Sequence, residues 1–332
     1  MQSYTLNELA RICNLELKGN NTDSVIIESV TSLTSEKKNA LGYIEHEKFY
    51  SLAQNSKVAA ILIPKELKYY SFIKPVLISE NPVIDFIKIS NLFLPKLTKS
   101  GIHPSAIISP SAIIGNNVFI DQGVFIGNNV VIGDSTLIYA SSWIGDNVCI
   151  GKNCLIHPFV VIANSILEDD IEIFSHAAIG LDGFGFKFDG SKWLKVPHFG
   201  SVKIDSGCSI GSYSSINRGT YENTVIKKGV KFDAHVHIAH NVEVGEHTIL
   251  AAYSAVAGSS KLGDYCTLGG RVIVADHLQI CSHVTVLFGS VVSRSIRVPG
   301  VYGAHIPALP YRQWQRVFIS IIKAFSKDVK EL

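Results

Sequence analysis

Aliphatic residues recur at every sixth position over most of the chain. The first series comprises Ile102, Ile108, Ile114, Ile120, Ile126, Ile132, Ile138, Ile144, Ile150, Ile156 and Ile162. The later positions are Ile204, Ile210 and Ile216, then Ile226, Phe232, Ile238, Val244, Leu250, Val256, Leu262, Leu268, Val274, Ile280 and Val286. A period of six fits neither an α-helix nor an ordinary strand. It predicts a solenoid of very short parallel strands joined by tight turns.

One aliphatic side chain per hexad is expected to point inward and to stack on its equivalents in neighbouring coils. Each such burial contributes on the order of 1.5–3 kcal/mol, so together they form a continuous core. Gly, Asn and Asp follow the aliphatic residue in segments such as IGNNVF and IGDNVC. We expect these residues at corners that need a positive φ or an Asx turn.

Two segments lie outside the repeat and divide the chain into three parts. Residues 1–98 combine a helical pattern (LNELARICNL) with apolar segments (VAAILIP, KPVLIS), which predicts a small α/β domain ending near Pro95. The repeat domain spans 99–298, with a loop insertion at 181–200. The C-terminal extension, 299–332, alternates apolar and basic residues at helical spacing, so it is expected to contain a helix.

Composition narrows the class further. Of the 332 residues, 47% are hydrophobic and 17% charged, and the formal net charge of +2 argues against a nucleic-acid partner. No stretch approaches the roughly 20 apolar residues of a transmembrane helix, and the N-terminus has no apolar signal core. The six cysteines contain no CxxC pair, which indicates reduced packing residues in the cytoplasm.

Histidines among the hexads are the candidates for chemistry. The segment FDAHVHIAHN contains Asp233, His235, His237 and His240. A neutral imidazole can accept a proton at neutral pH, and a carboxylate can fix its tautomer. His277 follows about two 18-residue coils later, which is about 10 Å along the same edge at strand spacing. For some of the histidines an exposed corner position without chemistry is the favoured interpretation; these are His235, His237, His247 and His283. For His176 and His198 both interpretations, chemistry or an exposed corner, stay open.

The spacing His235-x-His237-x-x-His240 also allows a zinc site. Strand alternation puts His235 and His237 on one face, but His240 lies beyond the hexad boundary. Metal catalysis is therefore the less favoured interpretation.

The motifs IAHN, AGSS, DGFGF and PGVYG give the chain a resemblance to the LpxD family, the UDP-3-O-(3-hydroxyacyl)glucosamine N-acyltransferases of lipid A biosynthesis. The resemblance covers nearly the whole chain and is strongest from 182 to 303. It implies a mainly β protein: a left-handed parallel β-helix with a small N-terminal α/β domain and a C-terminal helix. It also implies a bacterial cytoplasmic homotrimer with active sites between subunits. The donor would be a 3-hydroxyacyl chain on acyl carrier protein, and the acceptor the 2-amino group of the UDP-sugar.

The resemblance assigns roles to individual residues. His240 would be the general base, Gly258 would offer its N–H to the oxyanion, Asp233 would support the base and His277 would assist nearby. The acidic carrier protein would meet a basic surface. That surface comprises Arg294, Arg297, Arg312 and Arg316. Amide formation from a thioester needs no metal and no organic cofactor.

In the N-terminal domain the resemblance places a uracil ring between two aromatics, here Tyr43 and Phe49, with His46 where the family has Asn. Other departures are Asn217 in place of Asp, Ala234 in place of Asn, and Phe288 where a small residue is commoner. These substitutions bear on substrate identity and acyl chain length, and they leave His240 in place.

Two alternatives remain beside this function. The chain could be a β-helix acyltransferase acting on another nucleotide-amino sugar, with acyl-CoA as donor. It could also be a non-catalytic β-helix that binds or scaffolds, in which case replacing His240 by Ala would change nothing.

Overall fold

The computed structural model describes residues 2–20, 22–95, 99–303 and 308–328. The chain divides into two compact units, Met1–Thr98 and Lys99–Leu332. Among the described helices, none combines the length and apolar character that crossing a bilayer requires. Each unit is described separately.

The N-terminal unit is a small α/β fold around a five-stranded sheet with the order β2-β7-β6-β5-β4. Its strands are β1 (Tyr4–Thr5), β2 (Glu16–Lys18), β3 (Ile26–Ile27), β4 (Ser29–Val30), β5 (Ala40–Tyr43), β6 (Ala60–Pro64) and β7 (Val76–Ser79). Its helices are α1 (Leu6–Ile12), α2 (Tyr50–Asn55) and α3 (Pro82–Leu92). A capping box between Thr5 and Glu8 starts α1, and Asn81 caps α3.

Alternation along β6 builds a core on each face of this sheet. Leu62 is buried in a cluster with Leu9 of α1 and Ile89 of α3. Ile61 is buried in a second cluster with Ala53 of α2. Because successive side chains of a strand point to opposite faces, this all-buried strand requires helices on both sides.

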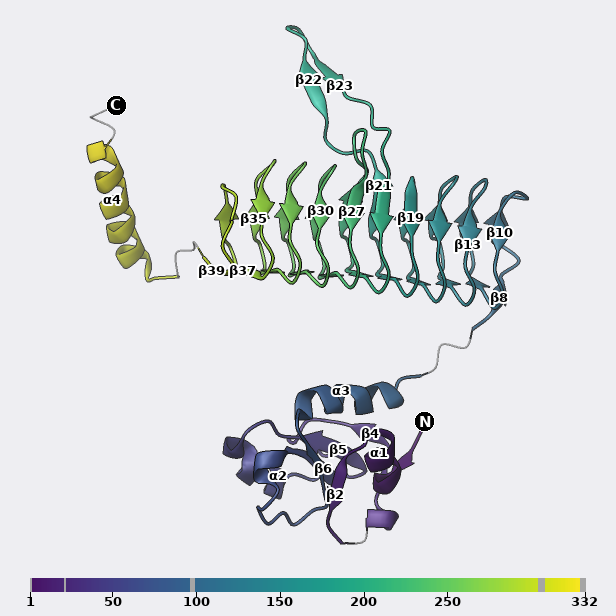
Figure 1. The fold of residues 1–332 in the computed structure, drawn as a ribbon, viewed down its shortest axis with the longest axis vertical. Coiled ribbons are helices and arrows are strands. Elements are labelled where there is room, and N and C mark those ends of the chain that lie inside the picture. The colour runs from purple at the N-terminus through teal and green to yellow at the C-terminus, as the bar shows by residue number, and fades with distance from the viewer. Residues whose placement is uncertain (1, 21, 96–98, 304–307, 329–332) are drawn as a thin grey trace. The chain divides into compact units, whose positions relative to one another are not determined.

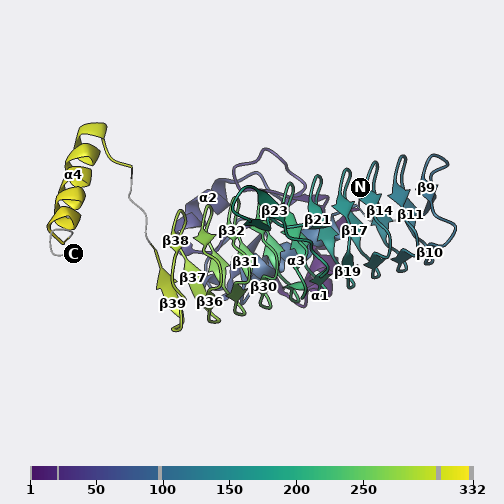
Figure 2. The ribbon, with the colours of Figure 1, turned by 90° about the horizontal axis from the view of Figure 1, so that it is seen from above.

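The repeat unit is a parallel β-solenoid whose strands stack along its length into three sheets (Figures 1 and 2). The first sheet contains β8 (Gly101–Ile102), β11 (Phe119–Ile120), β14 (Leu137–Ile138), β17 (Leu155–Ile156), β20 (Glu172–Ile173), β25 (Ser209–Ile210), β28 (Lys231–Phe232), β31 (Ile249–Leu250), β34 (Thr267–Leu268), β37 (Val284–Val286) and β39 (Gly300–Tyr302). The second contains β9 (Ile107–Ile108), β12 (Phe125–Ile126), β15 (Trp143–Ile144), β18 (Val161–Ile162), β21 (Ala178–Leu181), β26 (Ser215–Asn217), β29 (His237–Ile238), β32 (Ala255–Val256), β35 (Ile273–Val274) and β38 (Val291–Val292). The third contains β10 (Ile113–Ile114), β13 (Val131–Ile132), β16 (Cys149–Ile150), β19 (Ser165–Leu167), β24 (Val202–Ile204), β27 (Thr224–Ile226), β30 (Glu243–Val244), β33 (Lys261–Leu262) and β36 (Gln279–Ile280).

From Ile120 onward the period-six residues form the core, as the sequence predicted, whereas Ile102 in the first coil is exposed. Ile120, Ile138 and Ile156 pair in register along the first sheet and are fully buried. Each coil visits the first, second and third sheets in turn, so it has three corners, which we name 1–2, 2–3 and 3–1 after the sheets that they join. This hexapeptide solenoid confirms the fold class that the sequence predicted.

The corners depend on Asn and Gly for two different reasons. Asn residues carry the positive φ, for example Asn147 at 61°. Most glycines directly after the inward residue are needed for close approach instead. A Cβ on Gly133 would lie 2.5 Å from the carbonyl carbon of Gly151 in the next coil. The expectation of positive φ was therefore right for Asn and wrong for these glycines.

The insertion leaves the solenoid after β21 and forms a hairpin of β22 (Phe186–Phe188) and β23 (Trp193–Lys195), which projects from the coils in Figure 1. Beyond the solenoid, helix α4 (Tyr311–Asp328) is the helix expected in the C-terminal extension. Its described side chains include exposed apolar residues such as Phe318 and Ile319.

The cysteines are free, as expected for packing residues. Cys154 and Cys208 are buried in the solenoid core. Burial raises the pKa of each of these two thiols to about 11, so both stay protonated near neutral pH.

Candidate active site

The 2–3 corner carries most of the residues singled out for catalysis. Strands β29, β32 and β35 are consecutive in the second sheet, so His240, Gly258 and His277 follow one another on this corner. The N–H of Ser259 donates to the carbonyl of His240 at 3.0 Å, and the N–H of His277 donates to the carbonyl of Gly258 at 3.0 Å. His277 therefore lies two coils from His240 along one edge, about 10 Å at the usual strand spacing.

Asn241 orients the imidazole of His240. Its side-chain oxygen lies 3.1 Å from Nδ1 of His240 and also accepts the backbone N–H of Thr220 at 3.0 Å. Its amide nitrogen donates to the carbonyl of Glu222 at 3.1 Å, which fixes which end of the amide is oxygen. Because an amide oxygen only accepts, Nδ1 carries the proton and the lone pair of the neutral ring lies on Nε2.

The backbone of Gly258 lies against this ring. A Cβ built at Gly258 would lie 2.7 Å from Cε1 and 2.8 Å from Nε2 of His240. The N–H of Gly258 makes no hydrogen bond within the described part of the chain. The basic nitrogen and an unused backbone donor therefore stand side by side, which is the pairing that acyl transfer requires.

Asp233 is on a different corner from the base. It follows β28 on the 1–2 corner, where its carboxylate accepts the N–H of Ala234 at 2.7 Å and the N–H of Ala252 at 3.2 Å. Within the described residues of this one chain, the support that the resemblance assigned to Asp233 is given by Asn241.

The insertion begins beside His240. A Cβ on Gly183 would lie 3.2 Å from Cβ of His240 and 3.2 Å from Nε2 of His198, so the DGFGF segment contacts both rings. Asp182 anchors this segment through Lys195 Nζ at 2.6 Å, and Arg218 lies 3.9 Å away. The Lys195 hydrogen bond, with the positive charges around it, lowers the pKa of Asp182 below its ordinary value.

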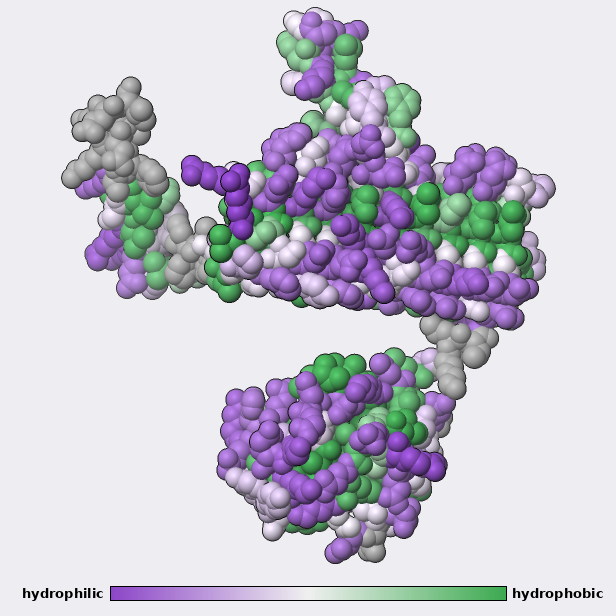
Figure 3. Space-filling view, viewed as in Figure 1, coloured by the Kyte–Doolittle hydropathy of each residue, from purple (hydrophilic) through white to green (hydrophobic). Residues whose placement is uncertain are grey.

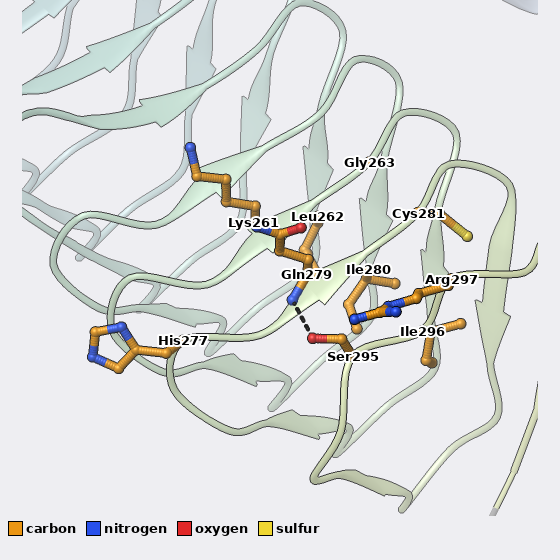
Figure 4. Close-up of a pocket in the computed structure, with 10 residues that line it drawn as sticks. All are labelled: Lys261, Leu262, Gly263, His277, Gln279, Ile280, Cys281, Ser295, Ile296 and Arg297. Carbon is orange, nitrogen blue, oxygen red and sulfur yellow. Dashed lines mark hydrogen bonds between the residues drawn. The ribbon is translucent and has the colours of Figure 1, made fainter.

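An open groove of about 680 Å³ lies next to His277 on the third sheet (Figure 4). Its polar side chains include Lys261, Gln279, Ser295 and Arg297, and the hydroxyl of Ser295 accepts the N–H of Gln279 at 3.0 Å. His277 stands at one end of this groove. Its lining offers cations and hydrogen-bonding groups to a ligand that approaches the 2–3 corner.

The four arginines of the predicted carrier-protein surface are all exposed. Arg297 lines the groove beside His277, and Arg294 precedes it in the same segment. Arg312 and Arg316 lie in the first half of α4.

In the N-terminal unit, Tyr43, His46 and Phe49 line one pocket of about 400 Å³. Lys48 lies over the ring of Phe49, 5.0 Å from its centroid. The ring of Tyr43 packs on Phe86 with centroids 4.4 Å apart, which holds it in place. The structure thus brings together the three residues that the resemblance assigned to a uracil ring.

Most corner histidines are members of ring stacks. His235 stacks between Tyr213 and Tyr253, with centroids 5.1 and 4.7 Å away. The 3–1 corner has the stack His247, Tyr265 and His283, and His176 stacks on Phe159 and Tyr213. His237 is different, since it lies exposed on β29 beside Ser215, where partial desolvation lowers its pKa. Among the described residues, His235, His237 and His240 form no metal-binding group.

Three of the four residues that depart from the family pattern lie on the solenoid, and the fourth, His46, lies in the N-terminal unit. Asn217 ends β26 at a bulge opposite Leu181, and Ala234 donates its N–H to Asp233. Phe288 is 60% exposed and follows β37 on the 1–2 corner, as Asp233 follows β28. His46 is exposed beside Glu45 at the rim of the N-terminal pocket.

Sequence reasoning missed Asn241 and left the role of His198 open. Asn241 could have been found, because it directly follows His240 in IAHN and carries the right acceptor. His198 had no such signal, since it lies 42 positions before His240 in an insertion without periodicity. Only the folded insertion brings the two rings to a centroid distance of 5.7 Å.

Comparison with known proteins agrees with this architecture. Residues 129–164 and 223–258 match the family profile "Bacterial transferase hexapeptide (six repeats)". A UDP-3-O-acylglucosamine N-acyltransferase of Janthinobacterium sp. is 41% identical over 162 residues, covering 48% of this chain and 46% of that protein. The corresponding Hahella chejuensis protein is 39% identical over 316 residues, covering 95% of this chain and 90% of its own length.

The first of these relatives is matched over less than half of its length. A solved structure, the Arabidopsis UDP-N-acetylglucosamine acyltransferase, is 24% identical with a TM-score of 0.53. It covers 65% of this chain and 76% of that chain, and it shares the fold.

The stacked coils and the matched repeats define the class, which is that of the hexapeptide-repeat transferases. The relative matched over 95% of this chain fixes the family. The chain belongs to the UDP-3-O-acylglucosamine N-acyltransferase (LpxD) family, which confirms the resemblance seen in the sequence.

Proposed function

We propose that this chain transfers a 3-hydroxyacyl group from acyl carrier protein to the 2-amino group of UDP-3-O-(3-hydroxyacyl)glucosamine. The product is the amide of lipid A biosynthesis, formed in the bacterial cytoplasm. The observation that carries the proposal is the arrangement of His240 between Asn241 and Gly258, which leaves a basic Nε2 beside an unused backbone N–H.

Each step of amide formation has a group on the 2–3 corner. The amine attacks the thioester carbonyl, and Nε2 of His240 takes the proton that the nitrogen loses. The N–H of Gly258 donates to the oxyanion of the tetrahedral intermediate. Collapse breaks the C–S bond, and the proton held by His240 passes to the leaving thiolate. His277, two coils away, lines the path of the donor.

The acceptor is bound by the N-terminal pocket in this proposal. Tyr43 and Phe49 offer aromatic faces to the uracil, and His46 replaces the usual amide with a ring that also carries donors and acceptors. The Hahella chejuensis relative is named for a UDP-sugar, which favours this assignment over another nucleotide.

The donor approaches from the groove at His277. Arg297 gives this groove positive charge, and Arg294 extends that charge along the same segment, whereas Lys261 is paired with Glu243. Exposed arginines on α4, Arg312 and Arg316, add a second cationic surface. An acidic carrier protein complements such surfaces, which raises the rate of encounter.

A homotrimer completes the active site. Asp233 and Phe288 lie on the 1–2 corner, whereas His240 and His277 lie on the 2–3 corner. In a trimer whose axis runs parallel to the solenoid, equivalent coils lie at equal height. If the second sheet faces that axis, the 1–2 corner of one subunit meets the 2–3 corner of its neighbour. An apolar band along the solenoid face in Figure 3 is the kind of surface that such contacts bury.

The test is N-acylation of UDP-3-O-(3-hydroxyacyl)glucosamine with 3-hydroxyacyl carrier proteins of several chain lengths. His240→Ala should lower kcat by about 10³–10⁴-fold, which is the contribution of a positioned general base together with its geometry. His247→Ala, which removes a ring from the 3–1 corner, is the matched control and should keep wild-type turnover. Equal activity of wild type and His240→Ala would exclude the mechanism, and no turnover with any donor would favour the binding or scaffolding alternative.

A further inference from the structure

His198 is a buried imidazole held inside the insertion. It follows β23 and is 6% exposed. The two glycines of DGFGF lie against its ring: a Cβ would come within 3.0 Å of Cε1 from Gly185 and 3.2 Å of Nε2 from Gly183. Phe184, between the glycines, is 85% exposed. The loop is therefore shaped around the ring of His198.

The protonation of this ring follows from its one hydrogen bond. Nδ1 of His198 lies 3.0 Å from the carbonyl oxygen of Val196. A carbonyl only accepts, so Nδ1 carries the proton and the neutral ring has its lone pair on Nε2. That nitrogen is buried and has no hydrogen-bond partner among the described residues. A buried acceptor without a donor is rare in folded proteins, because it loses its hydration without compensation.

The unpartnered acceptor stands beside the proposed base. The rings of His198 and His240 are 5.7 Å apart between centroids and meet edge to face at 70°. Gly183 is in contact with both rings, so no side chain separates them on that side. The Cβ position at Gly183 is 3.2 Å from Nε2 of His198 and 3.3 Å from Cδ2 of His240, so the unpartnered nitrogen lies on the side of the ring that is next to the proposed base.

We infer that His198 is a substrate-binding residue, whose Nε2 accepts a hydrogen bond from an O–H or N–H of the amino-sugar ring while His240 acts on the amine. The inference rests on the proposed function and extends it. A sugar presents several such hydrogen-bond donors around one ring. The thioester carbonyl and sulfur only accept, but the 3-hydroxyl of the acyl chain also offers an O–H, so the test varies the sugar and the acyl carrier protein separately. His198 takes no proton in the reaction. It orients the sugar substrate and makes no contact with the acyl carrier protein.

Two substitutions distinguish a hydrogen bond from His198 to the sugar from a purely structural role of the ring. His198→Leu keeps an apolar side chain between Gly183 and Gly185 and removes the nitrogen that accepts the hydrogen bond. His198→Gln keeps an acceptor oxygen at comparable reach. Steady-state kinetics with the sugar and the acyl carrier protein varied separately, together with calorimetric binding of UDP-glucosamine, give the readouts. His247→Leu on the 3–1 corner is the control for replacing a histidine ring.

We expect His198→Leu to lower kcat/KM for the sugar and to weaken UDP-glucosamine binding, each by about tenfold, the effect of one neutral hydrogen bond. His198→Gln should recover most of both, and KM for the donor should not change in either variant. Wild-type values in His198→Leu would overturn the inference, as would equal losses in both variants or a parallel change in the donor KM, which would indicate packing. Failure of the wild type to turn over would contradict the proposed function instead, and binding of UDP-glucosamine would still decide the role of His198.

Discussion

The imidazole of His240 lies directly against the backbone of Gly258. A Cβ at position 258 would be 2.7 Å from Cε1 and 2.8 Å from Nε2 of that ring. The contact joins the proposed base to the proposed oxyanion donor in neighbouring coils. It also makes glycine necessary at a position where the backbone itself is unstrained.

The first prediction concerns this contact. Gly258→Ala should push the ring of His240 out of place and lower kcat by about 10²-fold, since a displacement of about 1 Å at a reacting group has this effect. Circular dichroism and the melting temperature should change little, because the corner is partly exposed. Ser259→Ala, which adds no atom near the ring, should retain activity; a fully active Gly258→Ala would show that the contact is irrelevant to turnover.

The second prediction concerns the tautomer of His240. Asn241→Leu removes the oxygen that holds the Nδ1 proton, so kcat should fall roughly 10–100-fold, as for other groups that orient a reacting ligand. Asn241→Asp retains an acceptor at the same place and should be the more active of the two. The measurement is kcat for both variants across pH. An Asp variant as inactive as the Leu variant would point to the loop contacts of Asn241 with Thr220 and Glu222 instead.

The third prediction concerns the nucleotide pocket. Phe49→Ala should raise KM for the sugar acceptor by about tenfold with little change in kcat, because stacking on a base contributes on the order of 1–3 kcal/mol to binding alone. Binding of UMP, followed by fluorescence or calorimetry, should weaken in parallel. Tyr69→Ala, at an 88% exposed ring outside the pocket, is the control. Unchanged UMP binding in Phe49→Ala would place the nucleotide elsewhere.

The fourth prediction concerns pH and the base of the hairpin. Lys195 favours the charged form of Asp182 in the folded chain, so the pKa of Asp182 is lowered from its ordinary 3.8. A carboxyl group whose pKa is lower in the folded chain than in the unfolded chain stabilises the folded state at pH values above the unfolded pKa. This stabilisation is lost as the pH falls through the folded pKa. At neutral pH, amide exchange in β22–β23 should be at most about fivefold faster in Asp182→Asn than in wild type. Below the lowered pKa the two should converge; a difference that persists in acid would exclude the ion pair as its source.

The sequence by itself determined the solenoid and the family. A strict period of six leaves one inward position per hexad, and stacking such positions in register satisfies both the core and the backbone hydrogen bonds. The same spacing places His240 and His277 on one edge, because 18 residues make a coil wherever no insertion intervenes. The α4 helix and the α/β character of the first 98 residues were also readable, since both depend on local periodicity.

Only the tertiary structure decided which groups surround the base. Asp233 and His240 are seven residues apart, yet they lie on different corners, because strand β29, one side of the coil, lies between them. His198 lies far away in sequence and reaches His240 through the fold of an aperiodic loop. Hydrogen-bond partners and ring contacts of this kind depend on how loops close over the coils. The period of six does not determine the conformation of these loops, because it reports only which residues face the core of a coil. Contacts between residues distant in sequence determine that conformation.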